Sequence, residues 1–236
     1  GFYMGHPGKK LLFMGQEFGQ VHEWNENDDL DWEILQFPVH KQLQDYVKAL
    51  NELYVTHPAL YQEDYYPEGF QWINCTYHEE SLAMFVRQTR KPEETLLFVC
   101  NFDNMDHQNF KVGVPFYGKY KEILGSEEEK YGGTGMGNPR VKTAKAVECD
   151  GRDYSIEITI PAMSTMIFSC TPLEEPKKPA AKAASTASRR KGPKTVKAKT
   201  AAAKKAEAVK AEPKTAAKPK AEKEKGKAKE EKAKEK

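Results

Sequence analysis

The stretch HPGKKLLFMGQEFGQ, residues 6–20, joins a short apolar run to a loop rich in polar side chains. Lys10–Met14 is apolar without alternation, a pattern typical of a strand covered on both faces, as in a parallel sheet with helices outside it. From Gly15 onward the chain turns polar at once. Parallel sheets place their chemistry at the C-terminal ends of strands, so we expect a functional site in the loop that follows.

The loop after Gly15 is dense in the side chains that bind sugars. Carboxylates and amides hydrogen-bond to hydroxyl groups, and indole rings offer large flat faces on which a pyranose can stack. The residues of these types are Gln16, Glu17, Gln20, Glu23, Trp24, Asn25 and Trp32. The composition of the loop therefore indicates a carbohydrate site.

The apolar periodicity divides the following part of the chain into one helix and a set of strands. Pro38 opens an amphipathic helix, which should end before Pro58 because the residue preceding a proline disfavours the helical region. From Gly69 onward the period changes from 3.6 to 2. Apolar residues share a face within 82–86, 110–114 and 156–160, and 96–102, which is apolar except for Asn101, predicts a further strand. About six to eight short strands with turn signals between them predict an antiparallel β-sandwich.

The composition breaks sharply near Pro176. Residues 177–236 carry 22 Lys and Arg against 7 Glu, a net charge of +15, whereas residues 1–176 carry 15 basic and 28 acidic groups, a net charge of −13. The C-terminal part is almost wholly Lys, Ala, Glu, Pro, Thr and Ser, and cannot bury enough apolar surface to offset the entropy of ordering. We expect a disordered basic tail that binds polyanions non-specifically.

The acidic N-terminal part argues against specific nucleic-acid binding. No apolar run approaches the roughly 20 residues needed to span a bilayer, and we expect no membrane partner. The four cysteines form no C-x-x-C pair, and three lie in apolar strand-like runs, which favours buried free thiols in a cytoplasmic protein over disulfides.

Nine ordered blocks of the sequence together resemble one family. They are HPGKKLLFMGQEFGQ, EWN (23–25), LDW (30–32), LNELYVTHPAL (50–60), GFQWI (69–73), FVR (85–87), VCNF (99–102), VGVPFYGKYKEIL (112–124) and YGGTGMGN (131–138). In this order they resemble the C-terminal part of bacterial 1,4-alpha-glucan (glycogen) branching enzymes, which belong to the alpha-amylase superfamily. The resemblance runs from about Gly1 to Thr171, and many collinear blocks are more specific than any single motif.

The resemblance implies a fold class of α/β followed by all-β. Residues 1–66 would be the last β/α unit of a TIM (β/α)8 barrel, residues 67–173 the all-β C-terminal domain, and residues 174–236 the basic tail. In this family the Asp nucleophile, the Glu acid/base and a further Asp lie on barrel strands that precede the matched region. The chain would then be a fragment without catalytic residues, inactive alone, which carries part of a glucan cleft.

Four residues are our candidates for binding an alpha-glucan such as glycogen or amylose: Gln16, Glu17, Trp24 and Trp72. Each has a structural alternative. Glu17 could bond only to neighbouring backbone amides, Trp24 could pack the loop onto the barrel, and Trp72 could belong to the core of the β-domain, whereas Ile73 should face that core. For Trp32 we favour packing.

Other clusters predict no chemistry of their own. Asp28, Asp29, Asp31 and Glu33 lie on one polar loop without an apolar pocket to raise a carboxyl pKa, so we interpret them as a solvated loop rather than a glycosidase pair. The glycines of 132–137 do not follow the dinucleotide-binding spacing. No histidine has metal-ligand spacing, and we predict no metal and no cofactor.

The sequence thus favours a 1,4-alpha-glucan branching enzyme that makes alpha-1,6 branches. Three alternatives stay open. They are a non-catalytic carbohydrate-binding β module, another alpha-amylase superfamily hydrolase or debranching enzyme, and a nucleic-acid-associated protein that acts through its basic tail.

Overall fold

The computed structural model describes residues 1–175, and the predicted tail lies outside the described residues apart from its first two. Two helices come first, α1 (Phe2–Gly5) and α2 (Pro38–Thr56). The predicted amphipathic helix is thus confirmed, and Pro38 occupies its first turn, where the missing N–H costs nothing. The loops contain short 3-10 helices: η1 (Gln16–Phe18), η2 (Trp32–Gln36), η3 (Pro58–Leu60), η4 (Pro67–Gly69), η5 (Pro92–Glu94) and η6 (Glu129–Tyr131).

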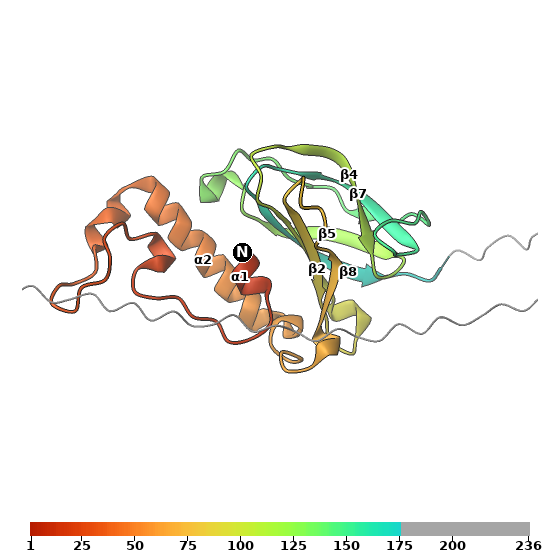
Figure 1. The fold of residues 1–236 in the computed structure, drawn as a ribbon, viewed down its shortest axis with the longest axis horizontal. Coiled ribbons are helices and arrows are strands. Elements are labelled where there is room, and N and C mark those ends of the chain that lie inside the picture. Colours follow the sequence, from red (N-terminus) through yellow and green to blue (C-terminus); the bar gives the residue numbers. More distant parts are fainter. Residues whose placement is uncertain (176–236) are drawn as a thin grey trace, which may run out of the picture. The chain divides into compact units, whose positions relative to one another are not determined.

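The rest of the described chain forms antiparallel sheets, which confirms the predicted all-β domain (Figure 1). The strands are β1 (Phe70–Asn74), β2 (Leu82–Arg87), β3 (Leu96–Asn101), β4 (His107–Val114), β5 (Gly118–Gly125), β6 (Lys142–Thr143), β7 (Tyr154–Ile160) and β8 (Thr165–Pro172). Six strands form one sheet in the order β1-β2-β3-β8-β5-β6, and β4 pairs with β7 in a second sheet. All of these pairings are antiparallel.

The six-stranded sheet is covered on both faces. One face packs against β4 and β7 through an apolar core that includes Val86, Val99 and Ile158. The opposite face packs against α1, α2 and η3 through Leu50 and Phe98, among others. Two-sided burial explains why 96–100 is apolar without alternation, since alternate side chains of β3 enter different cores. The strand ends at Asn101, and Phe102 of the predicted run is 51% exposed.

The predicted buried strand at Lys10–Met14 is wrong for this structure. The segment has no regular secondary structure, and Leu11 is 73% exposed and Phe13 48% exposed. The physical reason is the lack of a partner: a strand needs neighbours for its N–H and C=O groups, and none of the strands in residues 1–175 pairs with it.

The predicted buried thiols are correct for two of the four cysteines. Cys100 and Cys170 are buried, whereas Cys75 is exposed and Cys149 is half-buried in the turn before β7; all four are free. Burial raises the pKa of the Cys100 thiol to about 11, so it is protonated and unreactive at neutral pH.

Asp150 joins three parts of the β-domain. It lies in a turn before β7 with a left-handed φ of 54°, and its carboxylate accepts hydrogen bonds from Asn74 Nδ2 (2.7 Å), the Tyr77 hydroxyl (2.9 Å) and the Gly113 amide (2.7 Å). Burial and the bond to Asp150 raise the pKa of Tyr77 to about 12. The carboxylate thus connects β1, the loop after it and β4.

We expect Asp150→Ala to lower the free energy of unfolding by about 3 kcal/mol, because it leaves three donors unsatisfied in a partly buried site. Urea unfolding of the chain measures the loss. Asp153→Ala removes an exposed carboxylate three residues further on and should change stability by less than about 0.5 kcal/mol. Equal losses in the two variants would contradict the assigned role.

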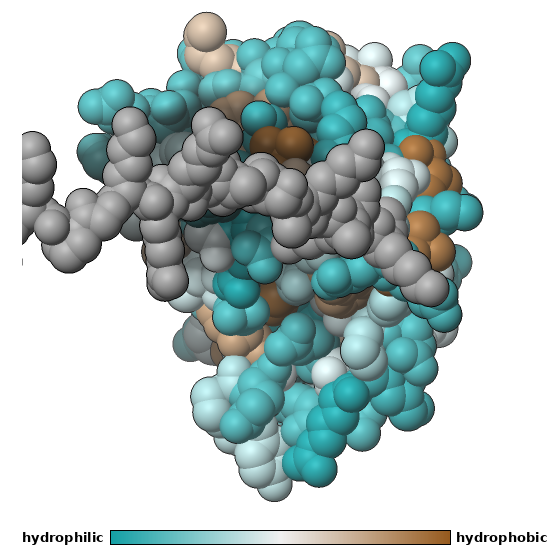
Figure 2. Space-filling model, turned by 90° about the vertical axis from the view of Figure 1, so that its right-hand side faces the viewer, coloured by the Kyte–Doolittle hydropathy of each residue, from teal (hydrophilic) through white to brown (hydrophobic). Residues whose placement is uncertain are grey.

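Figure 2 shows one face of the molecule, and the coloured part of this face is mainly hydrophilic (teal). Apolar residues (brown) are scattered over it. In the described part of the chain, no helix has the length and apolarity required to span a membrane.

Candidate functional site

Two glycines with left-handed backbones set the position of Gln16 and Glu17. Gly15 (φ 82°) and Gly19 (φ 69°) bound the single turn η1, and such angles favour glycine because it has no Cβ. Phe18 in this turn is fully buried and anchors it, so Gln16 lies exposed and Glu17 half-exposed on its outer side. Gln16 Oε1 also accepts a hydrogen bond from the Phe13 amide at 2.8 Å.

The loop after η1 is held by its own side chains. Gln20 Oε1 accepts a hydrogen bond from the Asp31 amide at 3.0 Å, and Gln20 Nε2 donates one to the His22 carbonyl at 3.2 Å. His22 Nδ1 lies 2.7 Å from the Asp31 carboxylate. Gln20 is of a sugar-binding type, but neither Gln20 nor His22 is among the four candidates from the sequence, since nothing in a spacing of 11 residues signals that Gln20 meets Asp31.

Gln16 and Trp24 line one surface hollow of about 420 Å³. Trp24 is 46% exposed, and its ring meets Phe13 edge-to-face with 5.6 Å between centroids. The remaining lining residues are Met14, Gln20, Val21, His22 and Glu23. An exposed indole beside amide and carboxylate groups is chemically suited to a sugar, because the ring offers a stacking face and its neighbours offer hydrogen-bond partners.

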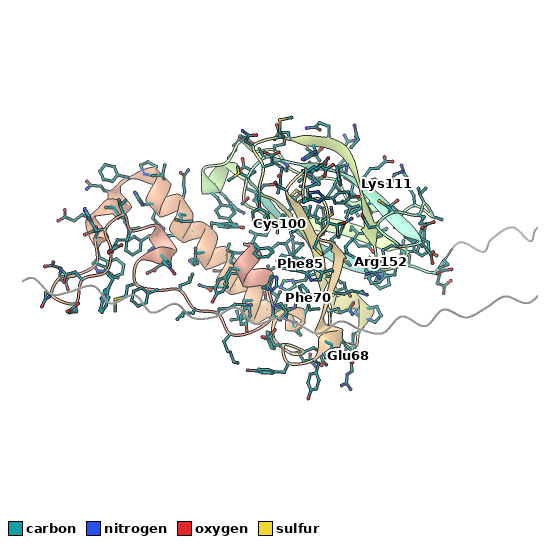
Figure 3. The ribbon with its side chains drawn as sticks, viewed as in Figure 1. Glu68, Phe70, Phe85, Cys100, Lys111 and Arg152 are labelled. Carbon is teal, nitrogen blue, oxygen red and sulfur yellow. The ribbon has the colours of Figure 1, made fainter. Side chains whose placement is uncertain are left out.

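The other two candidates lie elsewhere among the described residues. Glu17 borders a second hollow of about 400 Å³, together with Val47, Lys48 and other residues of α2. Trp72 belongs to β1 and packs edge-to-face against Phe70, with 5.0 Å between centroids, on the sheet face shown by Phe70 and Phe85 in Figure 3. It remains 37% exposed, while Ile73 is buried in the sandwich core as predicted.

Trp32, for which the sequence favours packing, contacts Phe18 but is not buried. Its ring lies 5.1 Å from that of Phe18, and the remaining 53% of the residue is exposed. The nearby acids Asp28, Asp29 and Glu33 are exposed. No apolar pocket surrounds any of these three carboxylates in the described structure, and they lack the setting of a glycosidase acid.

The glycine-rich loop YGGTGMGN surrounds a carboxylate of the protein itself. Glu122 Oε2 accepts hydrogen bonds from the Asn138 amide (2.7 Å) and from Asn138 Nδ2 (3.0 Å), and Asn138 is buried. Burial raises the pKa of the Glu122 carboxyl, and the hydrogen bonds from Asn138 act in the opposite direction by lowering it. A negative group already satisfies these donors, so the loop does not offer a phosphate cradle.

Within residues 1–175, no cluster of three or more His, Cys, Asp or Glu side chains could hold a metal ion.

A known family model matches the β-domain. Residues 72–171 match the family model of the alpha amylase C-terminal all-beta domain, which covers strands β2–β7 in full. The chain is also similar to bacterial proteins named 1,4-alpha-glucan branching enzyme GlgB, which confirms the resemblance found in the sequence.

Three of these relatives show the extent of the similarity. The Synechococcus elongatus enzyme is 42% identical over 168 residues, which cover 71% of this chain and 22% of the relative. The Bacillus cereus (strain Q1) enzyme is 45% identical over 168 residues, or 71% of this chain and 26% of the relative. The Aquifex aeolicus enzyme is 42% identical over 166 residues, or 70% and 26%. The match thus spans about a quarter of the length of these relatives.

Proposed function

We propose that the chain is part of a 1,4-alpha-glucan branching enzyme, which transfers an alpha-1,4-glucan segment to a 6-hydroxyl and makes alpha-1,6 branches in glycogen. The observation that carries this proposal is 42–45% identity, over 166–168 residues, to relatives that bear that name. The partner is an alpha-glucan polymer, and the setting is the cytoplasm.

Residues 1–66 would form the last unit of a (β/α)8 barrel, followed by the C-terminal domain at 67–173 and the basic tail at 174–236. The exposed apolar run Leu11–Met14 supports the barrel assignment. An isolated barrel strand has no partners for its backbone groups, and it would be buried only between neighbouring strands and helices.

In the proposed enzyme the bond chemistry belongs to carboxylates outside this chain. The family resemblance implies a retaining double displacement, in which an Asp attacks the anomeric carbon and a Glu protonates the leaving oxygen and later deprotonates the acceptor hydroxyl. Gln16, Glu17 and Trp24 would hold and orient the glucan at the end of the eighth strand, and Trp72 would offer a further stacking surface on the β-domain. Binding and exclusion of water would favour a sugar acceptor over hydrolysis.

A branching assay on amylose tests the proposal. The protein encoded with its sequence upstream of Gly1 should form alpha-1,6 linkages, whereas residues 1–236 alone should form none. In the active protein, Trp24→Ala should lower kcat/KM about tenfold, or about 1.4 kcal/mol of transition-state stabilisation. Tyr65→Ala removes an exposed ring that lines neither hollow, and it should change kcat/KM by less than about twofold.

The same assay separates the alternatives. Release of reducing sugar without new alpha-1,6 linkages would indicate a hydrolase, and loss of existing branches would indicate a debranching enzyme. If residues 1–236 bind amylose and Trp72→Ala alone abolishes this binding, the carbohydrate-binding module is the better assignment. Branch formation by residues 1–236 would contradict the proposed absence of catalytic residues.

A further inference from the structure

Arg87, at the end of β2, is a fully buried cation that binds three separate segments. Its guanidinium forms an ion pair with Asp64, which is also buried. Nη1 donates to the Gly5 carbonyl at the end of α1 (2.8 Å), and Nε donates to the Gly69 carbonyl just before β1 (3.2 Å). A guanidinium is costly to bury, and here each of its three nitrogens has a partner, so its position is tied to all three segments.

The two carbonyls that Arg87 binds belong to glycines at positions too crowded for a Cβ atom. A Cβ on Gly5 would lie 2.5 Å from Phe98 Cε1 and 2.9 Å from Phe85 Cζ, and a Cβ on Gly69 would lie 2.3 Å from the Glu63 carbonyl oxygen. A larger residue would therefore push α1 away from the sheet at Gly5, and would push the backbone away from Glu63 at Gly69. Glycine at these two positions allows the close approach that brings both carbonyls to the guanidinium.

The end of α1 is also where the chain leaves for the candidate site. The C-terminal carbonyls of a helix lack intrahelical partners, and Arg87 satisfies that of Gly5, while Lys10 Nζ bonds to the His6 carbonyl. The Leu11 amide bonds to the Tyr3 hydroxyl of the same turn. From there only three residues separate Leu11 from Gly15, the residue just before η1. The β-domain thus fixes the start of the site loop through α1.

We propose that Arg87 is a positioning residue for the glucan site: from the β-domain it holds the end of α1 and so sets where the loop with Gln16 and Trp24 begins. This inference rests on the proposed function for its catalytic consequence. Lysine cannot replace arginine here, because one ammonium group cannot reach an Asp64 carboxylate and two carbonyls in the fork geometry of a guanidinium.

The experiment compares Arg87→Lys with Ile158→Val, a control that loosens the sandwich core without touching α1. Hydrogen exchange of the chain should show the Gly5 and His6 amides, bonded within α1, exchanging at least about tenfold faster in Arg87→Lys. In the same variant the exchange rates of the Ile156 and Ile158 amides of β7 should change by less than about threefold. In Ile158→Val the pattern should be the opposite, with faster exchange in β7 and little change in α1. If Arg87→Lys does not fold, Gly5→Ala replaces it, and it should show the same faster exchange in α1.

The functional arm uses the complete protein at a temperature where every variant is folded. Arg87→Lys and Gly5→Ala should each lower kcat/KM for amylose at least about tenfold, since a misplacement of about 1 Å can cost a hundredfold, and Ile158→Val should lower it less than about twofold. Unchanged kcat/KM in both α1 variants, or the same exchange pattern in variant and control, would overturn the positioning role. If the unsubstituted protein forms no branches, the proposed function fails instead, and the exchange arm alone decides whether Arg87 holds α1.

Discussion

Phe98→Ala should lower the free energy of unfolding of this chain by about 4 kcal/mol, because truncating a buried phenylalanine costs both its transfer energy and a cavity. Phe98 is fully buried in β3 and stacks on Phe85, with 4.9 Å between centroids and 7° between planes. Its ring also lies where a Cβ on Gly5 would collide, so α1 rests directly on it. The loss should therefore loosen the helices and the sheet together, and chemical denaturation followed by tryptophan fluorescence measures it.

Phe13→Ala is the matched control, since it removes the same ring from a 48% exposed position in the segment without secondary structure. Phe13→Ala should lower the free energy of unfolding by less than about 1 kcal/mol. A loss at Phe13 close to that at Phe98 would mean that the predicted buried strand forms in solution after all. A loss below about 2 kcal/mol at Phe98 would show that the sheet and helices collapse around the cavity.

The elements that the sequence predicts correctly are those whose partners lie within the chain. The helix from Pro38 shows its period over five turns, and the inner side chains Leu50 and Leu53 find the sheet. The run 96–102 predicts an apolar strand, and β3 (Leu96–Asn101) has a core on each face. Lys10–Met14 shows the same local pattern, yet it forms no strand, because apolar runs record burial but not which segment supplies the hydrogen bonds.

The candidate site is predictable in composition but not in geometry. Residue type alone selects Gln16 and Trp24, which the structure brings to one hollow. Glu17 follows Gln16 directly but borders a different hollow, since successive residues of a tight turn point in different directions. The role of Arg87 cannot be predicted from the sequence for another reason. Its three partners lie 18 to 82 residues away, and no local pattern signals such a contact.

Hydrogen exchange should separate the described chain into two regimes. The amides of β3 and β8 lie in the centre of the six-stranded sheet, buried on both faces, and should open only by global unfolding. The Leu11 and Phe13 amides bond to side chains, whereas the Lys9, Lys10 and Leu12 amides have no partner in the described structure. We expect these three to exchange at least about a thousandfold faster, which corresponds to about 4 kcal/mol of local opening energy. From the sequence alone, all of residues 1–66 would be expected to exchange fast, as a β/α unit without its barrel.

The packing of α2 changes that expectation for half of the segment. Leu50, Leu53 and Leu60 are buried against the sheet, so the amides of the second half of α2 should share the slow regime of β3. Mass spectrometry of peptides from 1–14 and 48–60 decides between the two expectations. Fast exchange in both peptides would mean that the helix leaves the sheet when the proposed barrel is absent. Slow exchange in 48–60 alone would show that the β-domain and α2 form one cooperative unit, to which the site loop is attached through α1.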